Sequence, residues 1–177
     1  MGRCPCLKVI RDKVIPALNR CIEEFVFRGL PVFATRDWHP INHCSFRSQG
    51  GTWPEHCVAG TPGAEIPDSL KLPAAAELIS KANTPEDNAY SGFHGTDLLS
   101  RVRARGCCRV FVGGLATDYC VKCTVLDALS NDLAVVVLKD AIRAVDVQPG
   151  DGARALAEMV ARGAAVTTIE NACAPKP

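Results

Sequence analysis

The sequence predicts an α/β fold: a three-layer sandwich in which a mainly parallel sheet has helices on both faces. Short apolar runs rich in β-branched residues alternate along the chain with segments whose apolar residues recur at helical spacing. The longest run, Leu133 to Leu138, contains no polar residue and is typical of a strand buried on both faces. With 177 residues and 47% apolar content, the chain can build one sizeable core. We expect one domain over residues 14–170, after an atypical segment (1–13) and before a tail (171–177).

Periodicity and glycine or proline positions place the elements in order. Apolar residues from Val14 to Val26 recur at helical spacing, and Gly29 closes that helix. A long segment rich in glycine and proline follows the first strand and runs to about Pro73, and loops of that length inside a compact domain usually carry function. The expected strands are residues 31–35, 76–80, 109–112, 133–138 and 165–169, and the later helices are one from Thr96 to Gly106, one after strand 109–112 and one at 151–162.

The turn after strand 109–112 carries a cysteine where a helix begins. The order is strand, Gly113-Gly114 and helix, and the side-chain oxygen of Thr117 or Asp118 can cap that helix. Cys120 then lies in the first turn, where free backbone N–H groups and the helix dipole favour a thiolate. From this turn alone, a nucleophilic cysteine and an ordinary buried cysteine are equally good interpretations.

Net charge and the length of apolar runs limit the partners. The formal net charge is +1, and no stripe of Lys and Arg marks a surface for nucleic acid or an anionic membrane. The longest apolar run is too short to cross a bilayer, and the N-terminus lacks the apolar stretch of a secretory signal. We therefore expect a cytoplasmic protein with a small-molecule partner, no nucleic-acid or membrane partner, and reduced thiols for its ten cysteines. The oligomeric state stays open between a monomer and a homo-oligomer.

Residues that carry chemistry follow three of the predicted strands. Asp37 and His39 come after the first, Lys81 after the second and Cys120 after the third. In open α/β sheets, ligands bind beyond the carboxyl ends of the strands, so these residues are expected at one rim. That shared place raises Lys81 from an ordinary surface charge to a candidate partner of a Cys120 thiolate.

The long loop concentrates residue types that bind metals. Three of the chain's four histidines, His39, His43 and His56, lie in it beside Asp37. Asp37 and His39 can reach one ion, and His56 completes a set of one carboxylate and two imidazoles. Such a set leaves coordination positions open, as catalytic metal sites do. Any one of these histidines alone would be better interpreted as an ordinary loop residue.

Four separate stretches carry a more specific pattern. They are Thr35-Arg36-Asp37-Trp38-His39-Pro40, the segment from Trp53 to Glu65, Lys81 followed by Ala89-Tyr90-Ser91-Gly92-Phe93, and Gly114-Leu115-Ala116-Thr117-Asp118-Tyr119-Cys120-Val121. Together, in this order, they resemble the nicotinamidases of the isochorismatase-like cysteine hydrolases, from about Val14 to the last strand. The resemblance implies the isochorismatase-like hydrolase fold. It also implies hydrolysis of nicotinamide to nicotinate and ammonia, a step of NAD salvage.

The resemblance implies a role for each matching residue. Cys120 would be the nucleophile, with Lys81 as its charged partner. A divalent metal, usually zinc, would hold the pyridine nitrogen. Its ligands would be Asp37, His39 and His56. His43 is a weaker ligand candidate, because only some members use a histidine there.

The remaining implied roles concern the substrate. Trp53 and Tyr90 would line the ring pocket, and Leu115 counts with them among the substrate-binding residues. The peptide bond between Leu115 and Ala116 would be cis. The backbone N–H groups of Ala116 and Cys120 would bind the developing oxyanion, so that Ala116 belongs to the catalytic set.

One part of the family pattern has no match. The family begins with a strand that ends in a catalytic aspartate, whereas only Met1 to Lys13 precede the expected helix here. Asp12 either caps that helix, or Leu7-Lys8-Val9-Ile10 forms a shortened strand that delivers Asp12 to the rim. The first alignment fits better, because Asp12 to Pro16 continues the family's helix start without a gap. The general base is then absent, and the middle of the sheet is open.

Three hypotheses from different classes follow. The chain is an active amidase, an inactive or truncated relative that still binds metal and ring, or an interaction domain whose cysteines only pack. Within the enzyme class, the alternative is another amide or carbamoyl hydrolase of the same superfamily. The set of metal ligands, Asp37, His39 and His56, argues against that alternative. A metal at this place would serve to bind a ring nitrogen, as the resemblance to nicotinamidases implies.

Overall fold

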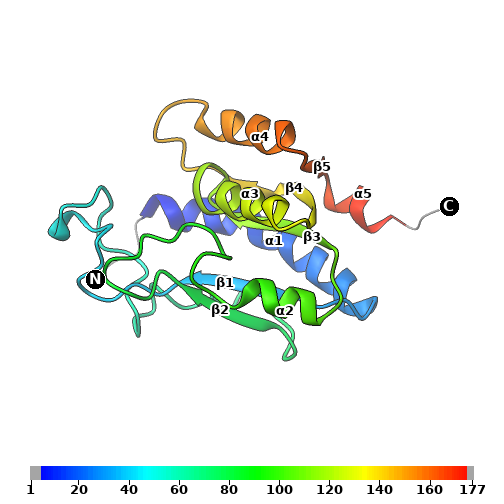
Figure 1. The fold of residues 1–177 in the computed structure, drawn as a ribbon, viewed down its shortest axis with the longest axis horizontal. Coiled ribbons are helices and arrows are strands. Elements are labelled where there is room, and N and C mark those ends of the chain that lie inside the picture. Colours follow the sequence, from blue (N-terminus) through cyan, green and yellow to red (C-terminus); the bar gives the residue numbers. More distant parts are fainter. Residues whose placement is uncertain (1–4, 175–177) are drawn as a thin grey trace.

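Strands and helices alternate along the chain in the computed structural model, which describes the backbone of residues 5–174 and the side chains of residues 12–174 (Figure 1). The described elements are α1 (Pro5–Phe27), β1 (Phe33–Asp37), β2 (Glu77–Lys81), α2 (Leu98–Ala104), β3 (Arg109–Leu115), α3 (Lys122–Ser130), β4 (Ala134–Arg143), α4 (Asp151–Ala161), β5 (Ala165–Thr167) and α5 (Ile169–Cys173). A short 3-10 turn (Arg47–Gln49) lies in the long loop, and a π-helical turn (Thr117–Val121) joins β3 to α3.

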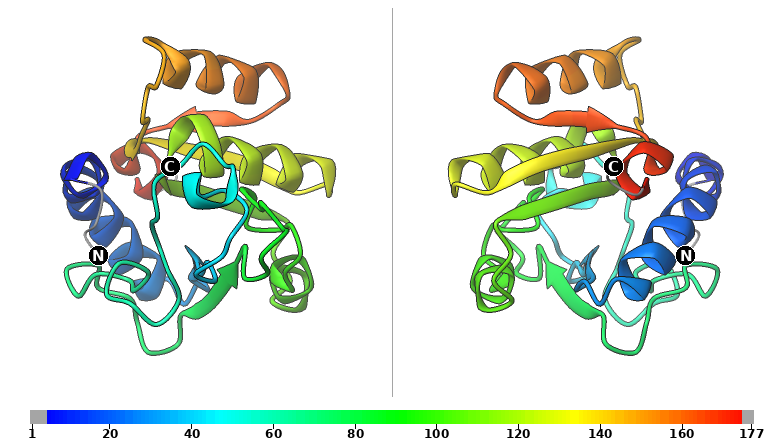
Figure 2. Two further views of the ribbon diagram at one scale, coloured as in Figure 1. Left: turned by 90° about the vertical axis from the view of Figure 1, so that its left-hand side faces the viewer. Right: turned by 90° about the vertical axis from the view of Figure 1, so that its right-hand side faces the viewer.

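All strand pairs described are parallel, and they form two separate sheets. One has the order β1-β2 and the other the order β3-β4-β5. Helices α1 and α5 pack on one face of the second sheet, and α3 and α4 lie over its other face (Figure 2). The predicted three-layer α/β sandwich is confirmed. The predicted opening in the middle of the sheet is also present, since no described strand joins β1 to β3.

The first helix begins earlier than the sequence pattern predicted. α1 starts at Pro5, whose fixed φ suits the first turn of a helix, and Lys8, Arg11 and Lys13 are good helix formers. Residues 7–10 are therefore helical, and the alternative of a shortened strand is wrong. The expected cap is wrong as well, because Asp12 lies exposed within the helix rather than at its start. Residues 1–4 and 175–177 of the expected terminal segments lie outside the described residues.

Strand ends are the other difference from the predicted elements. β1 ends at Asp37, so this carboxylate belongs to the strand itself. β3 runs through the glycine pair to Leu115, because its ladder with β4 resumes at Gly114 after an irregularity. β5 stops at Thr167, because Thr168 caps the unpredicted α5 by accepting the N–H of Asn171.

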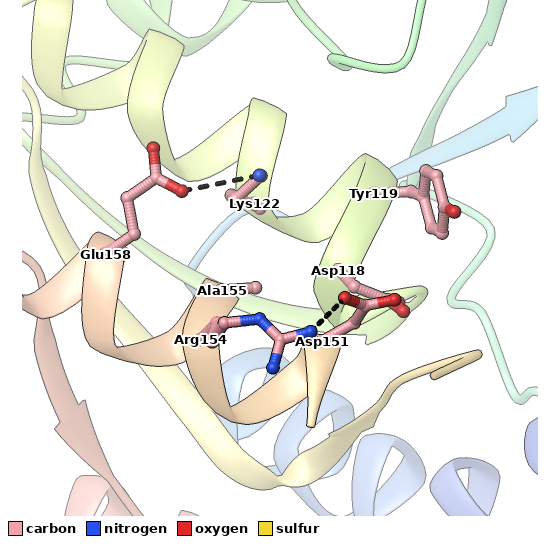
Figure 3. Close-up of a pocket in the computed structure, with 7 residues that line it drawn as sticks. All are labelled: Asp118, Tyr119, Lys122, Asp151, Arg154, Ala155 and Glu158. Carbon is pink, nitrogen blue, oxygen red and sulfur yellow. Dashed lines mark hydrogen bonds and ion pairs between the residues drawn. The ribbon is translucent and has the colours of Figure 1, made fainter. Parts of the chain in front are cut away.

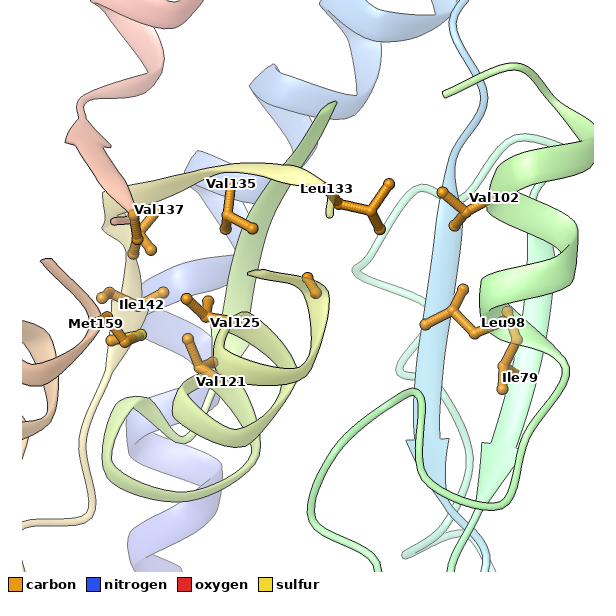
Figure 4. Close-up of a cluster of buried hydrophobic side chains, with 12 residues drawn as sticks. Ile79, Leu98, Val102, Val121, Val125, Leu133, Val135, Val137, Ile142 and Met159 are labelled. Carbon is orange, nitrogen blue, oxygen red and sulfur yellow. The ribbon is translucent and has the colours of Figure 1, made fainter. Parts of the chain in front are cut away.

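The main apolar core joins the helices to both sheets. Its most buried members are at most 1% exposed: Val102, Val125, Ala128, Val137 and Met159. Figure 4 shows the cluster in two groups, one on α3, α4 and β4 and the other on α2 and β2. A smaller cluster packs α1 against β4 and α5. These contacts fix the two sheets relative to each other and so fix the rim where their strands end.

Two findings bear on the expected environment of the chain. Within residues 5–174, no helix is both long enough and apolar enough to pass through a membrane. The cysteines described in full are all free thiols: Cys21, Cys44, Cys57, Cys107, Cys108, Cys120, Cys123 and Cys173.

Candidate active site

The carboxyl ends of β1, β2 and β3 meet at one rim, as predicted. Asp37 and Lys81 are the last paired residues of the β1–β2 ladder. The Lys81 ammonium lies 3.6 Å from the Cys120 sulfur, which brings the turn after β3 to the same place. Parallel strands therefore deliver a carboxylate, an ammonium and a thiol to one point.

Lys81 is the centre of this group. It is 3% exposed, and its ammonium donates to Asp37 Oδ1 at 2.5 Å and to the Ala89 carbonyl at 2.9 Å, besides its contact with Cys120. These three contacts use all three donors of the ammonium. Burial alone would lower the pKa of Lys81, but the charges of Asp37 and Cys120 outweigh burial and raise it, so the side chain stays a cation.

Three residues form a group able to hold a metal ion. One ligand atom each from Asp37, His39 and His56 lies within 4.8 Å of the other two. The Nδ1 atom of His39 is 3.1 Å from the Ala82 carbonyl, and Nδ1 of His56 is 2.8 Å from the Pro54 carbonyl. A carbonyl at Nδ1 fixes the tautomer that leaves Nε2 as the ligand atom. Burial lowers the pKa of His39 to about 4, so this imidazole is neutral, as a ligand must be.

His43 does not belong to this group. It is fully buried, with Nδ1 at 2.7 Å from the Ser45 hydroxyl and Nε2 at 3.1 Å from the Asp87 carbonyl. Both ring nitrogens therefore have protein partners. The ring centre of His43 lies 4.1 Å from that of His39, so His43 packs behind a candidate ligand and holds its ring in place.

Backbone hydrogen bonds join the two ends of the loop that carries the histidines. His39 donates its N–H to the Cys57 carbonyl at 2.9 Å, and its own carbonyl accepts the N–H of Ala59 at 2.8 Å. These bonds place His39 beside the segment that carries His56. The fully buried Phe46 ring contacts the rings of both histidines.

The turn that carries Cys120 differs from the prediction in its capping. The cis peptide bond between Leu115 and Ala116 is present, and Ala116 precedes the π-helical turn. Neither Thr117 nor Asp118 caps the helix with its side chain. The expectation of such a cap is wrong because the Asp118 carboxylate has other partners, the backbone groups of the segment after β4. It accepts the N–H of Val145 at 3.0 Å and that of Asp146 at 2.9 Å.

Three aromatic rings lie together near the turn. Trp53 Nε1 donates to the Tyr90 hydroxyl at 3.0 Å, so the two predicted ring-binding residues are in contact. The ring centre of Tyr119 lies 5.0 Å from Trp53 and 5.6 Å from Tyr90. Sequence analysis missed Tyr119, although its position next to Cys120 was the signal that could have identified it.

Comparison with known proteins fits this geometry. Residues 8–171 match the family model of the isochorismatase domain. The chain belongs to the isochorismatase domain family. A nicotinamidase of Escherichia coli (strain K12) is 38% identical over 179 residues, which cover 89% of this chain and 84% of that protein.

Two solved structures share the fold of this family member. The pyrazinamidase of Pyrococcus horikoshii in complex with zinc has a TM-score of 0.84 at 49% identity, covering 89% of this chain and 86% of that one. PnC1 from L. infantum in complex with nicotinate has a TM-score of 0.82 at 34% identity, covering 89% and 80% of the two chains.

The thiol of this isochorismatase-family chain is less acidic than the sequence predicted. Burial and the charge of Asp37 raise the pKa of Cys120 to about 11, although Lys81 acts in the opposite direction. The expectation of a lowered pKa is wrong because it counted Lys81 and the helix start but neither the burial of the thiol nor the charge of Asp37. That carboxylate belongs to the candidate metal group, so the charge balance at Cys120 depends on both sites.

A second pocket, of about 370 Å³, lies on the far side of the same turn (Figure 3). Lys122 pairs with Glu158 at 3.3 Å, and Arg154 pairs with Asp151 at 2.6 Å. Each cation thus has an acid of the same pocket as its partner, and the pocket has little net charge to attract an ion. Its lining residues are Asp118, Tyr119, Lys122, Asp151, Arg154, Ala155 and Glu158.

Proposed function

We propose that this chain is a metal-dependent cysteine amidase that hydrolyses nicotinamide to nicotinate and ammonia, the reaction expected of an NAD salvage enzyme. The observation that carries the proposal is the position of Lys81, which contacts the Cys120 sulfur and the Asp37 carboxylate at once. A nucleophile candidate and a metal-binding group are thereby joined by one buried cation. The nicotinamidase of Escherichia coli, at 38% identity, supports the same reaction.

The residues divide the chemistry between them. The Cys120 sulfur attacks the amide carbon and a C–S bond forms. The C–N bond then breaks, and the nitrogen leaves as ammonia after it takes up the proton that the thiol gave up. The backbone N–H groups of Ala116 and Cys120 bind the developing oxyanion, which is typically worth about 3 kcal/mol per donor. Water then cleaves the thioester to release the acid and restore the thiol. Lys81 stabilises the Cys120 thiolate before the attack and again when the thioester is cleaved.

The metal group fits a divalent cation, which we propose to be zinc. Asp37, His39 and His56 offer one oxygen and two nitrogens, and the carbonyl partners at both Nδ1 atoms leave the Nε2 atoms for binding. When bound, such a cation supplies a Lewis acid and an open position for a ring nitrogen. Trp53 and Tyr90 then lie where a flat ring can pack.

A second candidate function is binding without efficient turnover. Asp12, the carboxylate nearest in sequence to the family's missing aspartate, lies exposed within α1 and not at the end of a strand element. The carboxylate that acts on Cys120 is Asp37, which is already bonded to Lys81. Without a further proton acceptor, the chain would bind nicotinamide and hydrolyse it poorly.

Ammonia release from nicotinamide, measured on the purified protein with added zinc, tests the proposal. We expect release that disappears in Cys120→Ala and persists in Cys123→Ala, the matched control on the next turn. Benzamide, which lacks the ring nitrogen, should be a much poorer substrate, and an aliphatic carbamoyl compound tests the alternative hydrolase. Nicotinamide binding seen by calorimetry without ammonia release would favour the second candidate, and neither binding nor release would refute both.

A further inference from the structure

Two cysteines from distant parts of the sequence meet where α5 packs on α1. Cys21 lies in α1 and is buried, and Cys173 is the last residue of α5 and is half-buried. The two helices are in contact on one face of the second sheet, whereas α3, which follows Cys120, lies over the other face (Figure 2). The chemistry of the candidate active site uses neither of these two thiols.

The side chains of the two cysteines are directed at each other. Both belong to the smaller apolar cluster, in which Cys173 packs against a buried group that includes Cys21 and Leu138. The Cys173 thiol is also a hydrogen-bond partner of the Cys21 thiol. A disulfide requires cysteines whose side chains point toward one another, so little backbone movement separates this thiol pair from a covalent bond.

Polar contacts at both ends of α5 hold Cys173 in this position. At the start of the helix, both carboxylate oxygens of Asp140 accept the N–H of Ile169 at 3.1 Å. At its end, the Arg28 guanidinium of α1 donates to the Cys173 carbonyl at 2.5 Å. Each thiol is therefore at a high effective concentration for the other, which favours a bond between them over bonds to separate molecules.

Burial gives the two thiols different reactivities. Cys21 is 8% exposed, and burial raises its pKa to about 12, so it is a poor first nucleophile. Burial and the charge of Glu24 also raise the pKa of Cys173, but the charges of Arg28 and Arg20 act in the opposite direction. Cys173 is half-buried and is therefore the thiol of the pair that a small reagent reaches first.

We propose that Cys21 and Cys173 form a reversible disulfide, with a low-molecular-weight disulfide such as oxidised glutathione as the oxidant. The Cys173 thiolate attacks one sulfur of that reagent, and the first glutathione leaves. The Cys21 thiolate then attacks the Cys173 sulfur of the mixed disulfide, and the second glutathione leaves. The two cysteines are oxidised, and the reagent is reduced to two thiols that carry the two protons lost by the protein.

The first step makes the second one easier. In the reduced pair, the charge of Cys173 and its hydrogen bond are among the causes that raise the pKa of Cys21, after burial. Neither acts once the Cys173 sulfur belongs to a mixed disulfide. Cys21 then loses its proton more readily, when its attack closes the bond between α1 and α5.

The neighbouring thiols of Cys107 and Cys108 are a poorer pair. Their peptide bond is trans, which places their Cα atoms about 3.8 Å apart. Disulfides normally need a Cα separation of at least about 4.4 Å, so a bond here would distort the backbone. A bond between Cys21 and Cys173 instead joins two helices that already pack. It closes a loop of most of the chain, and cross-links of long loops restrict the unfolded state most.

Oxidised glutathione tests the proposal on the reduced full chain under native conditions, without added zinc or nicotinamide. After the remaining thiols are alkylated, mass spectrometry of unreduced peptides should show Cys21 joined to Cys173, with a mass decrease of two hydrogen atoms. The midpoint of urea unfolding should rise by about 1 M or more, and dithiothreitol should reverse both changes. Because neither metal nor substrate takes part, the result is independent of the proposed amidase activity.

Three variants assign the bond. Cys21→Ser should stop at a mixed glutathione disulfide on Cys173, and Cys173→Ser should show neither the cross-link nor the rise in the urea midpoint. Cys108→Ser, the control at an exposed thiol, should behave as the unmodified protein does. If Cys21→Ser does not fold, Cys173→Ser at the half-buried position decides the matter. The proposal is overturned if the unmodified protein keeps glutathione on Cys173, joins Cys21 to another cysteine, forms disulfide-linked dimers, or gives no cross-link.

Discussion

Replacing Lys81 by methionine would remove the cation and keep most of the side-chain volume. The Lys81 charge lies 3.6 Å from the Cys120 sulfur. At an effective dielectric constant of about 20, a unit charge at that distance stabilises a thiolate by roughly 4–5 kcal/mol. Its loss should raise the pKa of Cys120 by about 3. The thiolate fraction at pH 8 then falls about a thousandfold. The more basic thiolate is also more nucleophilic, which recovers nearly half of the loss in reaction rate on a logarithmic scale. We expect Cys120 to react about 30-fold more slowly with a disulfide reagent.

The assay follows modification of the Cys120 peptide by mass spectrometry over time at several pH values. Lys122→Met is the matched control, because Lys122 is close in sequence to Cys120 but pairs with Glu158 on the surface. Its Cys120 should react at the wild-type rate. If Cys120 reacts as fast in folded Lys81→Met as in the unmodified protein, then Lys81 does not support the thiolate and the assigned role is wrong.

Four further outcomes are expected. His56→Ala should lose most of the bound zinc by elemental analysis while His94→Ala, at an exposed histidine, keeps it; equal zinc in both would refute the ligand set. Asp118→Ala leaves two backbone N–H groups without their acceptor and should lower the free energy of urea unfolding by about 2–4 kcal/mol, against almost no change for the exposed Asp68→Ala. The folded state holds the His39 pKa at about 4, so the unfolded chain takes up the proton first as pH falls. The free energy of unfolding should therefore decrease from pH 6.5 to 4, and His39→Gln should flatten that slope. Asp12→Asn should leave any ammonia release unchanged, and a collapse of the rate would show that Asp12 reaches the thiol.

Much of the site could be predicted because parallel strands collect distant residues at one rim. Placing Asp37, Lys81 and Cys120 after successive strands was enough to predict their meeting, and the β1–β2 register confirms the first pair. The helical capping of the Cys120 turn could not be predicted, since the partners of Asp118 lie after β4, far along the chain. Local propensity cannot reveal an acceptor's distant donors.

Charge balance was the other limit of the sequence. A lysine and a helix start both lower a thiol pKa, and the pattern around Cys120 showed both. The burial of the thiol, and the contact of Asp37 with the same lysine, were established only by the structure. Similarly, His43 has the spacing of a metal ligand, and only its contacts with Ser45 and the Asp87 carbonyl show that both nitrogens are already used.

Backbone hydrogen bonds close the loop that carries His39 and His56. They determine whether the entropy of ordering these two ligands is lost when the chain folds or when a metal binds. Because His39 bonds to the Cys57 carbonyl and to the Ala59 N–H, the segments carrying His39 and His56 are held together when the chain folds. A cation then meets two ligands whose spacing is already set, and its binding energy is not spent on closing the loop. Changes of loop length between Pro40 and Glu55 fall inside the loop that these bonds close, so the bonds at its base would keep the two histidines together. Changes after Thr61, outside these bonds, would leave their spacing intact as well.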